Sequence, residues 1–359
     1  MVASRRSFIA GLVASGLVPN ATWADAGSPA YLTAGMTPGG GYVLCGLRPD
    51  GRITFEVPLP ARGHAAAAHP VAPVAVAFAR RPGTYAMVLD CLDGAVKAQL
   101  TSPVGRHFYG HGAFSAEGDL LFTTENDYET TRGIVGVWDA RDGYKRLGEF
   151  RSGGTGPHDI KLMPDGASVV VANGGIETHP ETGRTKLNIP TMRPNLSYLS
   201  LDGAILDQTS LEDDLRRNSI RHLAVSAGGD VAFAMQWQGD AVDYPPVLGF
   251  HRRGARPCLA IVQGDATRAV RGYAGSVAFA GDAKTVAVTS PRGGVLQVFD
   301  AALGSLKRQV QIEDVCGVAA ASGGFFVTNG LGRVFDLPGA ASVAGVQHRI
   351  RWDNHLVAI

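Results

Sequence analysis

The feature that most constrains the fold is a repeated phrase in which a short apolar strand ends at a turn glycine. The seven copies end at Gly51, Gly94, Gly143, Gly203, Gly254, Gly304 and Gly339. Their mean spacing of about 48 residues matches the period of a β-propeller, whose blades contain four short antiparallel strands. The repeat therefore predicts an all-β chain folded as a seven-bladed β-propeller over residues 27–359.

The two ends of the chain each supply part of one blade. The N-terminal unit, "YLTAG", "YVLCGL" and "RITFEVPL", has only three strands, and the C-terminal "WDNHLVAI" resembles the first strand of the other units. Pairing these segments would leave no sheet edge open at the seam. We therefore expect a C-terminal strand to complete the N-terminal blade.

The extreme N-terminus has the pattern of an export signal. Arg5 and Arg6 lie in "SRRSF" before a short apolar run, and Ala24 and Ala26 offer small-residue cleavage points. This predicts a twin-arginine (Tat) signal over residues 1–26 and a periplasmic protein. A buried first helix explains the segment less well, because the run is short and has the flanks of a signal. No later stretch is apolar for the length that crosses a bilayer.

Composition and missing motifs exclude several classes of function. The formal net charge is +1, which gives no support for a nucleic-acid partner. The four cysteines show no CxxC spacing, so zinc-ribbon and haem-attachment sites are unsupported. P-loop, GxGxxG and GxSxG motifs are also missing, which argues against nucleotide binding and α/β-hydrolase chemistry.

Histidines recur where the innermost strands are expected to begin. All these strand entrances lie on one face of a propeller, around the mouth of its central channel. The histidines at this position are His111, His158, His222 and His355. Cys316 and Ser276 occupy it in two further blades. The second blade shows only apolar residues there, with His64 and His69 in the connection before it.

The expected channel is narrow and is surrounded by imidazoles and by one thiolate, that of Cys316. These groups favour a transition-metal site. Because adjacent blades share a ligand most easily, His111, His158 and His222 rank above His355. The alternative is a structural histidine that bonds neighbouring backbone in each blade.

The same face carries further polar candidates for binding a ligand or partner, most of them in loops. These residues are Glu125, Asp127, His179, Arg184, Arg221, Asp240 and Arg292. The arginines favour an anionic ligand as an alternative to a metal. We expect a non-catalytic binding protein. An enzyme of the lactonase or lyase type using the same pocket is the second hypothesis, and an interaction scaffold with residues 174–196 as its docking loop is the third.

Several long phrases resemble one known family. They include "FYGHGAFSAEGDLLFTTENDYETTRGIVGVWDA", "GPHDIKLMPDGASVVVANGGIETHPETGRTKLN", "SIRHLAVS", "TSPRGG", "DVCGVAA" and "WDNHL". They are similar to the DUF1513 family of exported bacterial proteins, whose function is unassigned. The resemblance implies a periplasmic propeller with a Tat signal, often encoded near imelysin-like and di-haem-peroxidase-like proteins linked to iron acquisition. Iron thus becomes the expected metal, and proteins of an iron-uptake system the expected partners.

Overall fold

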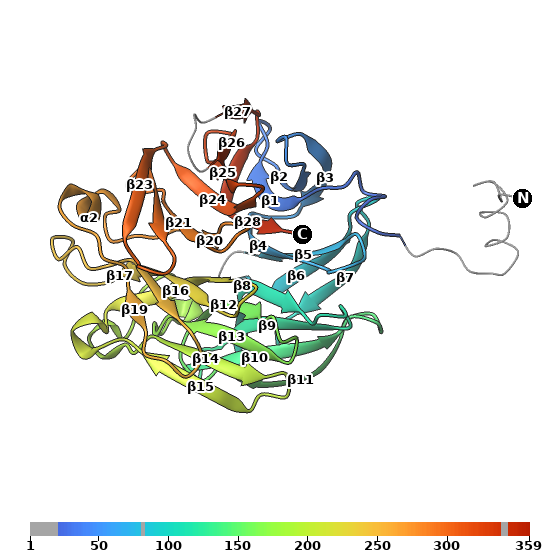
Figure 1. The fold of residues 1–359 in the computed structure, drawn as a ribbon. Coiled ribbons are helices and arrows are strands. Elements are labelled where there is room, and N and C mark those ends of the chain that lie inside the picture. The colour runs from blue at the N-terminus through green and yellow to red at the C-terminus, as the bar shows by residue number, and fades with distance from the viewer. Residues whose placement is uncertain (1–20, 80–82, 339–343) are drawn as a thin grey trace, which may run out of the picture.

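The chain forms seven four-stranded antiparallel sheets arranged around a central axis (Figure 1). The structure is a computed structural model that describes residues 21–79, 83–338 and 344–359. The predicted signal arginines, Arg5 and Arg6, and the turn at Gly339 lie outside the described residues. The seven-bladed propeller expected from the repeat is confirmed.

The first four blades contain sixteen strands, each blade running from the axis outward. They are β28 (Arg351–Ala358), β1 (Tyr31–Met36), β2 (Tyr42–Leu47) and β3 (Ile53–Leu59); β4 (Gly63–Ala68), β5 (Val74–Ala79), β6 (Tyr85–Asp90) and β7 (Val96–Thr101); β8 (Arg106–Phe114), β9 (Leu120–Asp127), β10 (Arg132–Asp139) and β11 (Lys145–Arg151); and β12 (Pro157–Leu162), β13 (Ser168–Asn173), β14 (Asn195–Ser200) and β15 (Ile205–Ser210).

The last three blades have the same order. They are β16 (Asn218–Val225), β17 (Val231–Trp237), β18 (Leu248–His251) and β19 (Cys258–Leu259); β20 (Ser276–Phe279), β21 (Thr285–Ser290), β22 (Val295–Asp300) and β23 (Leu306–Gln311); and β24 (Val315–Ala321), β25 (Gly324–Asn329), β26 (Arg333–Pro338) and β27 (Ala344–Gln347). Short helices occupy the connections: η1 (Pro180–Thr182), η2 (Ile189–Thr191), η3 (Asp213–Leu215) and α2 (Asp265–Ala269).

The C-terminal strand closes the ring, as expected. β28 pairs antiparallel with β1 and is the innermost strand of the first blade. Each innermost strand also contacts those of both neighbouring blades, in the cyclic order β4, β8, β12, β16, β20, β24 and β28. The first residues of these seven strands therefore surround one axis.

Apolar side chains form the core between blades, where the sheet faces meet. One cluster joins Phe78 of β5, Phe108 of β8 and Trp138 of β10. The repeated turn glycines between the two outer strands have φ of +62° to +92° wherever the structure describes them. This left-handed conformation is costly for other residues, which explains why the repeat retains glycine.

Part of the segment assigned to the signal packs on the propeller. The indole Nε1 of Trp23 donates a hydrogen bond to the carbonyl of His69 at 2.8 Å, and Trp23 and Ala26 join a buried apolar cluster. The signal boundary at residue 26 stays a prediction. Within the described ranges, the helices are too short or too polar to cross a membrane.

Candidate metal centre

β-Bulges interrupt the innermost strands at the ends that surround the channel mouth. Six of the seven innermost strands have extra residues there relative to the next strand of the blade, the exception being β20. A bulge breaks the alternation of side chains and can turn one toward a new direction. Five of these bulges contain or adjoin a histidine: His64, His111, His158, His222 and His355.

The five imidazoles form one compact group on the axis. Four rings form a closed cycle with 4.7–5.6 Å between neighbouring centroids, in the order His64, His158, His222 and His355. The fifth ring, that of His111, lies 4.8–5.7 Å from all four. These contacts are those of a square pyramid with His111 at its apex.

Potential ligand atoms converge within this group. Two sets of three histidines have one ligand atom each within 4.8 Å of the others: His64, His111 and His158, and His111, His222 and His355. Four ring nitrogens are buried with no hydrogen-bond partner, namely Nε2 of His111, Nδ1 of His158, Nδ1 of His222 and Nε2 of His355. Because an unsatisfied buried polar atom costs about 1–3 kcal/mol, these four nitrogens are unfavourable without a partner.

The environment keeps three of these imidazoles neutral, those of His158, His222 and His355. Burial lowers the pKa of His222 to about 3, because the charged form loses its hydration. Burial also holds the pKa of His158 well below its ordinary value, with a further contribution from the positive charge of Arg221. The pKa of His355 is likewise depressed, first by burial and then by the adjacent His64. Neutral imidazole is the form that binds metals.

Asp159 orients the apical histidine. Its Oδ1 lies 3.1 Å from Nδ1 of His111, while its Oδ2 accepts a hydrogen bond from the Leu223 amide at 3.0 Å. Burial alone would raise the pKa of Asp159, but Lys161 and His111 outweigh it and hold that pKa well below the usual range. An ionised carboxylate behind a histidine is the common support of a metal-ligating imidazole.

A small cavity opens onto the cycle of four rings. Its volume is about 120 Å³, and its lining residues are His64, Tyr109, His158, Arg184, Arg221, His222, Gln236, Tyr273, Asn354 and His355. His111 does not line it, which places the cavity on the side of the cycle away from the apex. Of the predicted ligand-binding residues, Arg184 and Arg221 reach this cavity.

Four predicted metal ligands are brought together, and the fifth is not. His111, His158, His222 and His355 all belong to the cluster. His355, which we ranked below the others, is equally close, since its ring lies 4.8 Å from that of His222. Cys316 belongs to neither ligand set within the described part of the chain. Its thiol lies 3.1 Å from the Asp314 carbonyl. Burial raises the pKa of this thiol above its ordinary value.

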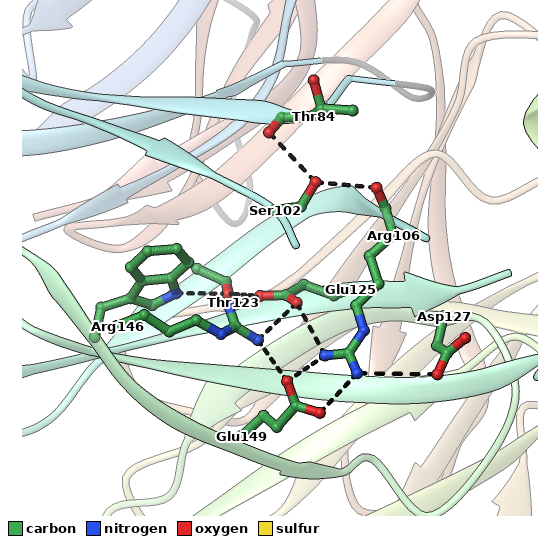
Figure 2. Close-up of polar contacts among 9 residues, drawn as sticks. Thr84, Ser102, Arg106, Thr123, Glu125, Asp127, Arg146 and Glu149 are labelled. Carbon is green, nitrogen blue, oxygen red and sulfur yellow. Dashed lines mark hydrogen bonds and ion pairs between the residues drawn. The ribbon is translucent and has the colours of Figure 1, made fainter. Parts of the chain in front are cut away.

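Glu125 and Asp127 belong to an ion-pair network of the third blade. We expected them in a loop, but β9 continues to Asp127, so both are strand residues. Glu125 is fully buried. Figure 2 shows its carboxylate facing Arg146 and Arg106, and Glu149 lies between the two guanidinium groups. Glu125 accepts hydrogen bonds from Arg146 at 2.8 and 3.0 Å. These contacts give the carboxylate a structural role away from the cavity.

The remaining predicted residues lie outside the cavity lining. His179 caps η1 and packs 4.9 Å from the Tyr128 ring. Asp240 is exposed and accepts a hydrogen bond from the Val242 amide. Arg292 lies 4.3 Å above the ring of Tyr273, which lines the cavity, and so supports its wall from outside.

Two residues of the histidine cluster and its support, His64 and Asp159, were missed. His64 was placed in a connection, but β4 (Gly63–Ala68) is the innermost strand of the second blade and His64 lies in its bulge. The ring of histidines therefore includes that blade. Gly110, in the β8 bulge with φ +103°, leaves room for the His64 ring, which a Cβ there would strike. The sequence signal for Asp159 was its position beside His158 in "PHDI".

Fold and site together define a seven-bladed β-propeller with a buried histidine cluster on its axis. The chain belongs to the DUF1513 family, described as a protein family of unknown function, whose model matches residues 57–359. Among curated proteins, none matches this chain in sequence. One similar solved structure is the hydrazine synthase of Kuenenia stuttgartiensis, with a TM-score of 0.60 and 11% identity over 89% of this chain and 96% of that one. At this identity the likeness concerns the fold alone.

Proposed function

We propose that the protein binds one first-row transition-metal ion at the five axial histidines. The observation that carries the proposal is that four rings of one compact cluster each have a buried nitrogen without a hydrogen-bond partner. Structural histidines that bonded the neighbouring backbone would have those atoms satisfied. An ion at the centre would satisfy them together.

The size of the cluster supports this proposal. A square with edges of 4.7–5.6 Å has a half-diagonal of about 3.3–4.0 Å. A metal–nitrogen bond of about 2.1 Å places an imidazole centroid roughly 3.2 Å from the ion. The rings therefore need to contract by less than about 1 Å, which side-chain rotation can supply.

The donor set bears on which metal binds. Five imidazoles suit copper, nickel, zinc and iron, and a tetragonal arrangement is typical of Cu(II) and Ni(II). Iron, which the family resemblance favours, is the proposed physiological metal, because availability outweighs intrinsic affinity in selecting metals in cells.

We propose that the protein is exported to the periplasm and serves there as an accessory to metal uptake, alone or with a metal-loaded partner. Replacing both Arg5 and Arg6 by lysine should leave the protein in the cytoplasmic fraction.

Metal analysis of exported, untagged protein tests the central proposal. We expect about one equivalent of metal per chain, and binding in titrations with Fe(II), Cu(II), Ni(II) and Zn(II). The His111/His158/His222 triple alanine variant should lose this metal, whereas His179→Ala, outside the cluster, should retain it. Circular dichroism checks that the triple variant folds, and single leucine variants replace it if it does not. Unchanged metal content in folded variants would refute the proposal.

A further inference from the structure

The cavity and the apical histidine lie on opposite sides of the four-ring cycle. Four of the five histidines line the cavity, and the one that does not is His111, which Asp159 holds from behind. An ion at the centre would thus receive five nitrogens and have its remaining face toward the cavity. Octahedral coordination leaves one position on that face.

We infer that this position is open to exchange and binds a small anion, which the cavity arginines help to hold. The inference rests on the proposed metal site. It goes beyond that site by assigning a ligand, of the class of small carboxylates and other monoanionic oxygen or nitrogen donors, to the cavity.

The charge of the cavity wall favours an anion over a cation or a neutral ligand. Of the ten described residues that line it, two are arginines and none is a carboxylate. Arg221 belongs to β16 directly before His222, at its bulge, so its position is set by the same backbone feature that places the metal ligand. Guanidinium groups bind carboxylates and similar anions through charge-assisted hydrogen bonds.

Neutral polar groups complete the wall. The side chains of Gln236 and Asn354, with the phenols of Tyr109 and Tyr273, add hydrogen-bonding groups around the opening. A volume of about 120 Å³ limits the ligand to a few non-hydrogen atoms. Exposed Arg184, in the connection between β13 and β14, lies at the outer part of this wall.

Among the described residues, the opposite side of the cluster has no comparable group of arginines. Below the histidines the channel is lined mainly by small and apolar residues of the innermost strands, including Ala67, Ala113 and Ala278. Lys161 is the charged side chain in that lining, and it lies 3.4 Å from Asp159, which neutralises it. Anions are therefore expected to enter from the arginine side.

Azide titration of copper-loaded protein tests this inference. Azide bound to Cu(II) produces a charge-transfer absorption band, so binding is read directly from the metal. We expect a saturable band, competition by acetate, and at least about 10-fold weaker azide binding in Arg221→Gln, because a charge-assisted contact is lost. Arg221→Lys should recover part of the affinity. Arg193→Gln, which removes an exposed charge that does not line the cavity, is the matched control and should bind azide normally.

Metal content is measured separately in every sample. A metal-loaded wild type whose spectrum azide does not change would overturn the open position while leaving the metal site intact. Normal azide binding in both Arg221→Gln and Arg184→Gln would overturn the role of the arginines. Protein that takes up no metal would refute the proposed function itself, and the inference with it.

Discussion

The Nδ1 atom of His111 lies 3.1 Å from the Oδ1 atom of Asp159, across the boundary between two adjacent blades. The carboxylate thereby fixes the proton of His111 on Nδ1 and leaves Nε2, which is buried without a partner, as the atom that can bind a metal. The orientation of the apical histidine thus depends on how the third and fourth blades pack.

Replacing Asp159 by asparagine should weaken metal binding by about 10- to 100-fold, the usual effect of losing such a support. The asparagine amide can donate to Nδ1, which would place the proton on Nε2 and block the metal. Competition titration with a chromophoric chelator measures the affinity. Asp240→Asn, on an exposed loop of the same face, serves as the control, and equal affinities for both variants would contradict this role.

Replacing His158 by leucine should stabilise the metal-free protein by about 1 kcal/mol, since it removes a buried nitrogen without a partner. His69→Leu should do the opposite, because Nδ1 of His69 accepts hydrogen bonds from the Val71 and Ala72 amides. Urea unfolding in the presence of a chelator measures both. If the two variants lose stability alike, the axial histidine is structural.

The stability of the metal-free protein should fall as the pH is lowered below about 6.5, the ordinary pKa of histidine in the unfolded chain. The folded pKa of His222 is about 3, so the unfolded chain binds more protons throughout the interval between these values. The loss approaches about 1.4 kcal/mol per pH unit for each such histidine. Urea unfolding from pH 7 to pH 5 measures this dependence. The free energy of unfolding should vary less steeply with pH in His222→Leu, by the equivalent of about one bound proton. Parallel curves for the two proteins would rule out a buried neutral His222.

Replacing Glu125 by glutamine should lower the free energy of unfolding by about 2–4 kcal/mol, because it leaves Arg146 and Arg106 short of a buried counter-charge. Metal content should not change, since Glu125 does not line the cavity. Asp142→Asn, which breaks an exposed pair with Lys145 in the same blade, should cost less than about 1 kcal/mol. Metal loss in folded Glu125→Gln would contradict the purely structural role assigned to this carboxylate.

The candidate site could be predicted only in part, for a physical reason. Strand patterns place His111, His158, His222 and His355 at equivalent positions, because each precedes an apolar run. His64 precedes a run of alanines, which resembles a connection as much as a strand, and it was missed. Glu125 was assigned to a loop because polar residues at the end of β9 hide the continuation of that strand.

The sequence by itself determined the number of blades, the closure by the C-terminal strand and the face on which the histidines gather. These features follow from local periodicity and from turn glycines. Both are signals that residues close together in the chain provide. Only the tertiary structure decided that five imidazoles meet on the axis, that Cys316 does not join them, and that Asp159 supports His111. Bulges and the packing of neighbouring blades set these relationships, and both depend on backbone geometry that side-chain pattern alone does not specify.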